Sequence, residues 1–429
     1  MSDVNPHYLD HVVKLSETSD IEASEDIVSG TGMKLLAKGA KIDARARERL
    51  LQFRLTKPLE NMLRVVGGTD PNSYHAVAER LLDEQALLRG VCVGATGFRP
   101  ENALKNLNLS PGVQSLLSVY VGQAPGKLEH AVGVTLLSAA LGGELSRDPA
   151  ELATLVIAAL AHDVGELYID PAFLRKGARL TPQQWKHVAT HPIVGSHVLG
   201  TLPGAGPRVA VAVMAHHERL DGFGYPQGTL AKGLSRLSQV LAAAEMLMGV
   251  SEAGAHTTER AEVALRLVPG EFGRHVVDRV SSAVRGTPSE IVPDAPDAAQ
   301  LDDRIASLAA SITQARLLRE QIEQDTGDSG AAARGLLRHA FERWERVRIA
   351  FSSTGLDSCS EEQLRPLIET MSPRERVEVE VVLRELQWRL DELERQLTLR
   401  SEHLAPADAK RVVELIAGIR QPVDAGAVS

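Results

Sequence analysis

The chain has 429 residues, of which 44% are hydrophobic and 24% charged, so it is globular and long enough for two or three domains. Its formal net charge of −9 argues against a general nucleic-acid-binding protein, which usually carries a basic surface. The two cysteines, Cys92 and Cys359, lie far apart and exclude a disulfide framework and a zinc ribbon. Aromatic residues make up only 3%, which favours helices built on Ala, Leu and Val.

No segment of the sequence is expected to cross a membrane. The longest apolar run, Leu152–Ala161, is too short for a span of about 20 residues. The N-terminal segment is acidic and polar, without the basic and apolar regions of a signal peptide. We therefore expect a cytoplasmic protein.

Residues 1–110 are predicted to form a small N-terminal α+β unit. Two short apolar runs within residues 25–43 flank the turn Ser29-Gly30-Thr31-Gly32, a pattern typical of a β-hairpin. Residues 44–53 are predicted to form a helix, and residues 74–122 to be mostly helical. This unit carries no chemical motif that predicts its role.

Residues 111–285 are predicted to form a helical, histidine-rich domain. Apolar residues recur at helical spacing in His130–Leu141 and Ala150–Ala161, and Ser238–Gly249 has the composition of a buried helix. The segment Arg208–Ala215 is ambiguous, because its alternating valines favour a strand while its surroundings are helical.

A Pro-rich linker at 286–300 separates this domain from a helical region at 301–429. In that region a capping box at Ser372 and Glu375 predicts the start of a long helix. The helix carries an apolar stripe at 4-3 spacing: Val379, Leu383, Leu386, Leu390, Leu393 and Leu397. The stripe fits either a coiled coil, which would make the protein a homodimer through its C-terminal helices, or a helix packed inside a bundle.

The histidines carry the chemistry of the sequence. Half of the 14 lie between His130 and His217, and the candidate metal ligands are His130, His162, Asp163, His191, His216, His217 and Glu245. Such a mixture of nitrogen and oxygen donors suits transition metals. The pair His162-Asp163 follows an apolar helix, where an unpaired charge would be costly, and an aspartate between histidines can bridge two ions.

The motifs around these residues resemble those of the HD-GYP subgroup of the HD-domain phosphohydrolases. The resemblance covers roughly residues 110–285. It rests on three motifs, which are His162-Asp163-Val164-Gly165, His191-Pro192-Ile193-Val194-Gly195 and His216-His217-Glu218-Arg219-Leu220-Asp221-Gly222-Phe223-Gly224-Tyr225-Pro226. Each motif alone is a weak signal, but their combination at this spacing is specific.

The resemblance implies a mainly α fold with an all-helical HD-type domain, which would also make Arg208–Ala215 helical. It implies a metal-dependent phosphodiesterase that hydrolyses cyclic di-GMP through a hydroxide bridging two divalent ions, iron or manganese. The seven candidate ligands above would hold the ions, with Asp163 as the bridge. Asp163 would be catalytic, and Gly224, Tyr225, Pro226 and Arg219 would bind the substrate. Glu166, which departs from the family pattern, is a second catalytic candidate, as an extra ligand or a base.

The sequence departs from the family pattern at several positions. Glu166 stands where the family usually has a lysine, Glu245 replaces the last aspartate ligand, and Met248 replaces a second acid. The segment Ser251–Thr257 lacks the usual cations, and Gly126 lacks the glutamate of trinuclear members, which favours a binuclear site. Two alternatives therefore stay open: a degenerate HD-GYP protein that acts as a nucleotide sensor or interaction scaffold, and a phosphohydrolase with another nucleotide substrate.

Overall fold

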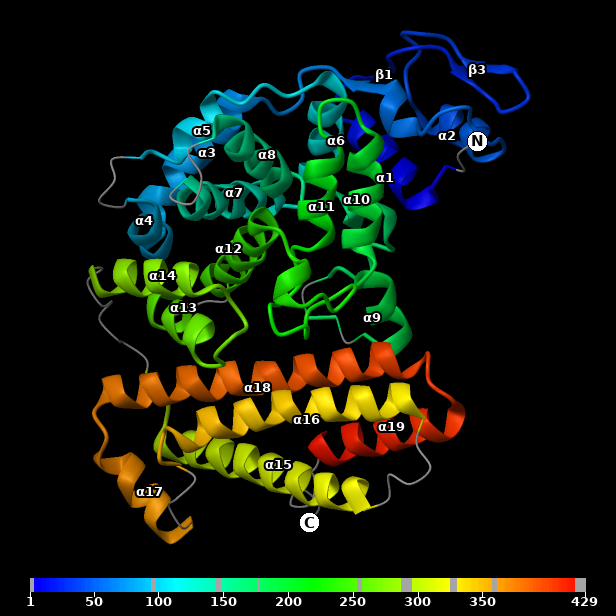
Figure 1. Cartoon of the computed structure of the whole chain (residues 1–429). Coiled ribbons are helices and arrows are strands. Elements are labelled where there is room, and N and C mark those ends of the chain that lie inside the picture. The colour runs from blue at the N-terminus through cyan, green and yellow to red at the C-terminus, as the bar shows by residue number, and fades with distance from the viewer. Residues whose placement is uncertain are drawn as a thin grey trace. The chain divides into compact units, whose positions relative to one another are not determined.

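The computed structural model of the protein describes residues 4–93, 98–143, 148–175, 177–178, 180–252, 257–286, 295–324, 330–356 and 361–420. The chain divides into two compact units, Met1–Glu252 and Ala253–Ser429, and both are dominated by helices (Figure 1). The predicted mainly α fold is confirmed. None of the helices in the described part of the chain is long and apolar enough to cross a bilayer.

The first unit begins with the predicted small α+β element. Its helices and strands are α1 (Pro6–Ser16), β1 (Ile21–Ala23), β2 (Ile27–Val28), β3 (Lys34–Leu36), α2 (Ala44–Leu51), the 3-10 helix η1 (Leu59–Met62) and β4 (Leu63–Val65). The predicted hairpin is confirmed, because β2 and β3 pair antiparallel with Ile27 opposite Leu36. β1 pairs antiparallel with β4, placing Ile21 opposite Val65, and so returns the chain to the helices that follow.

The rest of the first unit is helical. It comprises α3 (Pro71–Glu84), α4 (Ala86–Cys92), α5 (Glu101–Lys105), α6 (Pro111–Val121), α7 (Lys127–Gly143), α8 (Pro149–Leu160), η2 (Val164–Tyr168), α9 (Pro182–Val188), α10 (His191–Thr201), α11 (Pro207–Met214), η3 (Ala231–Gly233) and α12 (Arg236–Glu252). The ambiguous segment Arg208–Ala215 is helical, as α11. Tertiary packing overrides its local β-propensity, because α11 lies against α8, α10 and α12.

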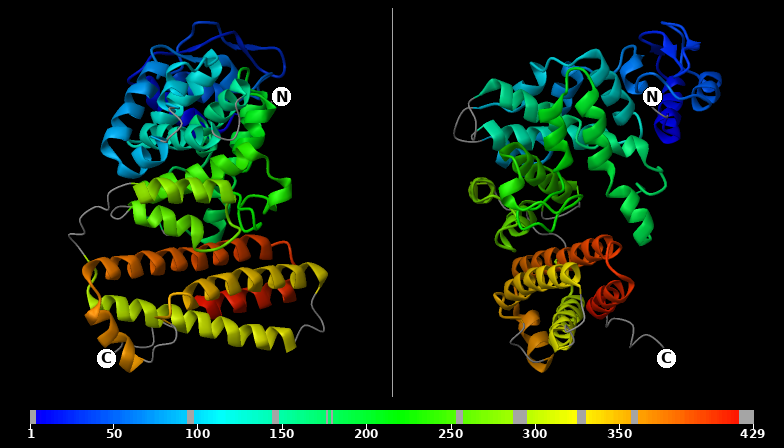
Figure 2. Two further views of the ribbon diagram at one scale, coloured as in Figure 1. Left: turned by 60° about the vertical axis from the view of Figure 1, so that its left-hand side comes forward. Right: turned by 45° about the vertical axis from the view of Figure 1, so that its right-hand side comes forward.

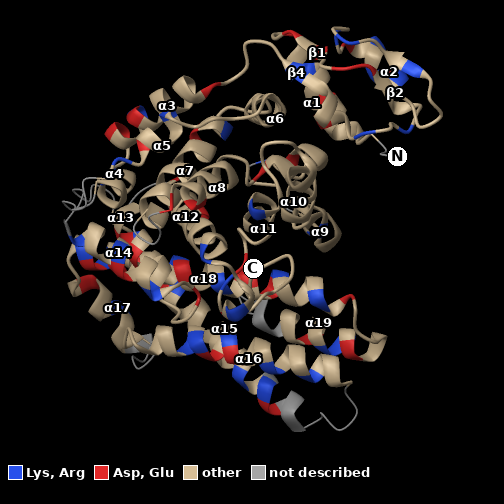
Figure 3. Ribbon diagram, turned by 45° about the horizontal axis from the view of Figure 1, so that its top comes forward, with Lys and Arg blue, Asp and Glu red and all other residues tan. Residues whose placement is uncertain are grey.

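Helix α7 is the core of this unit. Every residue from Ala131 to Gly142 is buried, and the helix packs against α3, α4, α8 and α12. A helix that is apolar on all sides needs neighbours on all sides, which explains its central position. Charged residues are correspondingly sparse on α7, α8 and α10 and frequent on α14–α18 (Figure 3).

The second unit is a bundle of helices: α13 (Thr257–Arg266), α14 (Arg274–Gly286), α15 (Ala298–Gln324), α16 (Ala331–Ser352), α17 (Glu361–Thr370), α18 (Pro373–Ser401) and α19 (Pro406–Arg420). Helices α15, α16 and α18 run side by side in all views (Figure 2). Helices α13 and α14, which the sequence analysis placed in the histidine-rich domain, belong to this unit, and α13 packs on α18. The predicted linker lies mostly outside the described residues, since 287–294 are not among them.

The apolar stripe of α18 lies inside this bundle. The helix starts at the predicted capping box of Ser372 and Glu375, and the stripe's leucines from Leu383 to Leu397 are buried. Helix α18 packs on α13, α15, α16 and α19 of the same chain. The bundle alternative therefore accounts for the stripe, and a homodimer through the C-terminal helices stays a prediction.

Candidate metal centre

Five helical elements bring the seven predicted ligands together. His130 lies in α7, His162 and Asp163 follow the end of α8, and His191 is the first residue of α10. His216 and His217 follow the end of α11, and Glu245 lies in α12. The ligand atoms form two groups, each within 4.8 Å: Asp163, His191, His216 and His217 in one, and His130, His162 and Glu245 in the other.

Asp163 lies between the two groups and presents one carboxylate oxygen to each. Its Oδ1 is 3.3 Å from Nε2 of His191 and 3.4 Å from Nε2 of His216. Its Oδ2 is 3.4 Å from Nε2 of His162 and 3.8 Å from Nε2 of His130. This is the arrangement that a carboxylate bridging two cations requires.

The backbone fixes the orientation of three imidazoles. Nδ1 of His162 donates to the carbonyl of Ala159 at 2.7 Å, since a carbonyl oxygen can only accept. His191 and His216 make the same bond to the residue three positions earlier, at 2.8 and 2.6 Å. In each case Nε2 faces the centre, and in the neutral ring it carries the lone pair. Metal-binding histidines are generally held in this way.

The nitrogens that face the centre are too close to one another for neutral imidazoles alone. Nε2 of His191 lies 3.0 Å from Nε2 of His216, and Nε2 of His130 lies 3.2 Å from Nε2 of His162. Two nitrogens bound at right angles to one metal ion at about 2.1 Å would lie about 3.0 Å apart. Two lone pairs that point at each other repel unless a cation lies between them. The Nε2 atoms therefore fit a bound metal ion.

Glu245 strengthens this assignment. Its Oε2 is buried and lies 3.2 Å from Nε2 of His130 and 3.1 Å from Nε2 of His162, without a hydrogen bond of good geometry from the described residues. A buried carboxylate oxygen without a hydrogen bond is costly, and a cation at this position would remove that cost. The longer side chain of glutamate therefore reaches the same centre as the aspartate of the family pattern.

The charges of the centre are strongly coupled. Burial works to raise the pKa of Asp163, but the surrounding imidazoles outweigh it and hold the pKa well below its usual range. Burial likewise works to lower the pKa of His162, but Asp163 and Glu245 raise it to about 10. For His217 burial dominates and the pKa falls well below its usual value. The carboxylates thus make the pocket attractive to a cation, whether proton or metal.

Glu166 does not enter either ligand group. Its carboxylate forms an ion pair with the ammonium of Lys127, and both side chains are largely buried. Burial and the nearby charge of Asp163 raise the pKa of Glu166, while Lys127 works against them. Because a cation accompanies it, Glu166 does not present the uncompensated negative charge that the sequence alone suggested.

The predicted substrate loop forms a wall beside the histidines. The ring of Tyr225 stacks on His217, with centroids 4.5 Å apart, and Trp185 meets Tyr225 edge-on at 5.6 Å. Gly224 packs against the backbone of Glu218, where a Cβ would lie 2.3 Å from the Glu218 Cα. The peptide bond between Tyr225 and Pro226 is cis. Arg219 is buried and donates from Nη1 to the carbonyl of Glu218 at 3.1 Å.

Sequence analysis missed four residues of the centre. Tyr120 donates from its hydroxyl to Oδ2 of Asp163 at 3.3 Å, and Glu252 accepts from Nδ1 of His130 at 3.0 Å. Lys127 supplies the cation beside Glu166, and Glu218 accepts from three backbone amides of residues 227–229. Only Glu218 carried a signal, as a part of the His-His-Glu motif; the others depend on the packing of distant helices.

The helical domain thus places one group of candidate ligands on each side of Asp163, an arrangement that could hold metal ions. Residues 114–275 match the family model of the HD domain. This match confirms the resemblance found in the sequence, and the HD and GYP motifs both lie within the matched residues.

Curated relatives match parts of this chain. The cyclic di-GMP phosphodiesterase PdeB of Borreliella burgdorferi is 29% identical over 115 residues, 27% of this chain and 30% of its own. The 3'3'-cGAMP-specific phosphodiesterase 3 of Vibrio cholerae is 30% identical over 251 residues, 54% of each chain. A cyclic di-GMP phosphodiesterase of Pseudomonas aeruginosa is 31% identical over 111 residues, 26% of this chain and 27% of its own. The chain thus spans about half or less of the length of each of these relatives.

Proposed function

We propose that the protein is a metal-dependent phosphodiesterase that hydrolyses a cyclic dinucleotide, with cyclic di-GMP as the first candidate. The observation that carries the proposal is the position of Asp163, whose two oxygens face two separate groups of metal ligands. Relatives named as cyclic di-GMP and 3'3'-cGAMP phosphodiesterases support the substrate class.

The donors favour two divalent ions of the iron or manganese type, because they combine imidazole with carboxylate. When bound, such a pair supplies positive charge for the phosphate oxygens and lowers the pKa of a coordinated water. Asp163 keeps the two ligand groups at a fixed separation, and Tyr120 orients its Oδ2. We assign a catalytic role to Asp163. We also assign one to Glu166, which holds the ammonium group of Lys127 beside the centre.

The substrate would enter beside the loop of Gly224, Tyr225 and Pro226. The aromatic wall of Tyr225 and Trp185 suits the flat face of a nucleobase, and Lys127 offers a positive charge to a phosphate. Arg219 remains the predicted arginine of the substrate site. With a net charge of −9, the chain would depend on bound metal ions and a few buried cations to attract an anionic dinucleotide.

The alternative of a degenerate sensor or scaffold has one structural observation in its favour. Met248, at the position of the family's second acid, is a core residue: a Cβ added at Gly133 of α7 would lie 2.4 Å from its sulfur. This position therefore offers no ligand or base. The residues 253–256 of the segment without cations lie outside the described part of the chain.

The test uses the full chain purified with Mn²⁺ or, without oxygen, with Fe²⁺. Cyclic di-GMP and 3'3'-cGAMP are followed by chromatography, and bound metal is measured by elemental analysis. We expect turnover of at least one of the two and bound metal near two ions per chain. Measurable binding of the dinucleotide without turnover would favour the sensor, and the absence of bound metal would refute the proposal.

The matched variants separate the metal centre from the general effects of losing a carboxylate. Asp163→Ala removes the bridge and should abolish both turnover and the second metal ion. Asp83→Ala removes an exposed aspartate of α3 and should change neither.

A further inference from the structure

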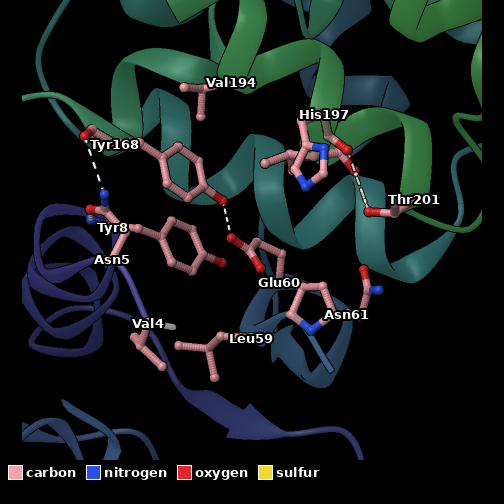
Figure 4. Close-up of a pocket in the computed structure, with 12 residues that line it drawn as sticks. Val4, Asn5, Tyr8, Leu59, Glu60, Asn61, Tyr168, Val194, His197 and Thr201 are labelled. Carbon is pink, nitrogen blue, oxygen red and sulfur yellow. Dashed lines mark hydrogen bonds between the residues drawn. The ribbon is translucent and has the colours of Figure 1, made fainter. Parts of the chain in front are cut away.

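A second pocket lies in the first unit, between the N-terminal α+β element and helix α10. It has a volume of about 190 Å³ and is lined by 12 residues that lie in α1, η1, η2 and α10 or directly before α1 and η1 (Figure 4). An engineered apolar cavity of about 150 Å³ is large enough for benzene, so this one has room for a ring with a short substituent. None of the predicted metal ligands or substrate residues lines it.

The pocket has one charged anchor and two aromatic rings. Tyr8 and Tyr168 stack in parallel, with centroids 5.2 Å apart. Their hydroxyl ends both point toward Glu60 (Figure 4), and the hydroxyl of Tyr168 donates to the Glu60 carboxylate. Burial raises the pKa of Glu60, although the hydrogen bond from Tyr168 works against it. A carboxylate in such surroundings gains from any N–H donor that enters the pocket.

The lining excludes anions. It contains neither lysine nor arginine, and Glu60 is its only carboxylate. Val4, Leu59 and Val194 add apolar surface, Asn5, Asn61 and Thr201 add neutral polar groups, and His197 lies at the exposed rim. A phosphate or a dinucleotide would meet the negative charge of Glu60, and the lining offers it neither lysine nor arginine. An ammonium group would meet a carboxylate and phenol oxygens, and its carbon body would meet the apolar walls.

We propose that this pocket binds a small organic cation with an apolar body, held by its ammonium group at Glu60, and that its occupancy is coupled to the metal centre. The coupling rests on the proposed metal centre, whereas the binding does not.

The coupling has a structural basis in two elements that the sites share. Tyr168 ends η2, which starts directly after Asp163, and Val194 and His197 lie in α10, whose first residue is His191. The two elements touch backbone to backbone, because a Cβ at Gly165 would lie 2.0 Å from the carbonyl oxygen of His191. A ligand seated between Tyr168 and α10 therefore acts on the separation of Asp163 and His191.

The binding test compares three molecules of similar size that differ in charge. Benzylamine, benzyl alcohol and benzoate are titrated into the full chain by calorimetry. We expect benzylamine to bind most tightly, benzyl alcohol more weakly, and benzoate not at all. Equal binding of all three, or binding of benzoate, would overturn the proposal, as would no binding of benzylamine.

A substitution then places the binding at this pocket. Glu60→Gln keeps an acceptor for the Tyr168 hydroxyl and removes the charge, so it should weaken benzylamine binding about tenfold or more. It should change benzyl alcohol binding by less than about twofold, since a neutral ligand gains little from the charge. Glu79→Gln, an exposed change on α3, is the control and should leave all three affinities unchanged. A thermal unfolding scan confirms that both variants fold, and an unchanged benzylamine affinity in folded Glu60→Gln would refute the site.

The coupling test measures the affinity of the chain for Mn²⁺ with and without saturating benzylamine. Coupling predicts a shift of about fivefold or more, with the same factor appearing in the benzylamine affinity when Mn²⁺ is saturating. Binding of benzylamine with an unchanged Mn²⁺ affinity would refute the coupling. A chain that binds no Mn²⁺ would refute the proposed metal centre, while the three titrations would still decide on the pocket.

Discussion

The ammonium of Lys127 and the carboxylate of Glu166 form a largely buried ion pair next to Asp163. Lys127 lies at the start of α7, and its Nζ is 5.3 Å from the centroid of the Tyr120 ring. Burial works to lower the pKa of Lys127, but Glu166 and Asp163 outweigh it and raise the pKa, so the group stays charged. The cation that balances Glu166 is therefore supplied from a different helix.

The first prediction separates the structural role of this pair from its role in catalysis. Lys127→Met leaves Glu166 without its partner and should lower the free energy of unfolding by about 3 kcal/mol, whereas Lys127→Met combined with Glu166→Gln should recover most of that loss. Both the single and the double variant should turn over a cyclic dinucleotide more slowly than the unmodified chain, because both lack the ammonium group of Lys127. Urea unfolding and a steady-state assay provide the two measurements.

Lys127→Arg is the conservative control for this prediction. It should keep the ion pair and most of the activity, with the change appearing mainly in KM. If the double variant, Lys127→Met with Glu166→Gln, were as active as the unmodified chain, Lys127 would have no role in substrate binding or turnover.

The second prediction concerns the glutamate that holds His130. Nδ1 of His130 donates to Oε1 of Glu252 at 3.0 Å, which directs Nε2 toward Glu245. Loss of such a partner typically lowers metal affinity by about 10–100-fold. Glu252→Gln should therefore weaken Mn²⁺ binding at the His130 group by about tenfold, measured by competition with a chelator. Glu48→Gln, an exposed change on α2, should have no effect, and an equal loss in both variants would contradict the assignment.

The third prediction tests the contact between η2 and α10. Gly165 has no side chain, and a Cβ there would lie 2.0 Å from the carbonyl oxygen of His191 and 2.8 Å from the amide nitrogen of Gly195. Both neighbours are backbone atoms, so the clash cannot be relieved by a rotamer change. Gly165→Ala should push Asp163 and His191 apart and lower Mn²⁺ affinity although it removes no ligand. Gly249→Ala is the matched control, because a Cβ there meets no atom within 4 Å. Equal Mn²⁺ affinity in the two variants would show that the contact does not position the ligands.

Some features of the site could be predicted from sequence because they depend on residues that are neighbours along the chain. His162 and Asp163 were predicted to sit at a buried helix end, and they do so because the apolar run before them forms α8. The hairpin and the capping box at Ser372 were also predictable, since turns and caps depend on neighbouring residues. The resemblance to the family, rather than local propensity, predicted that α11 is helical.

The rest depends on contacts between distant segments. Lys127 and Glu166 are separated by 39 positions, and Glu60 and Tyr168 by 108. No local periodicity specifies such pairs, because they arise only when the helices pack. The same holds for the position of α13, whose sequence continues the HD domain but whose packing partner is α18.

The last prediction concerns the buried charges of the second unit. Glu271 is almost fully buried and accepts from Nη2 of Arg343 at 2.7 Å and from Nη2 of Arg389 at 2.8 Å. Arg389 in turn contacts Glu385, which pairs with Arg260. This network of buried, desolvated charges joins α13, α16 and α18. Glu271→Gln removes the central negative charge while nearly preserving its shape.

Breaking a buried ion pair from one side costs about 3–5 kcal/mol, because the remaining charges stay buried without compensation. We therefore expect Glu271→Gln to destabilise the bundle by about that amount, with faster amide hydrogen exchange in α16 and α18. The exposed pair of Arg374 and Glu378 provides the control, since Glu378→Gln should cost at most about 0.5 kcal/mol. Exchange in α7 and α8 of the first unit should remain unchanged by Glu271→Gln. Equal effects of the two substitutions would show that the network contributes no more than a surface ion pair.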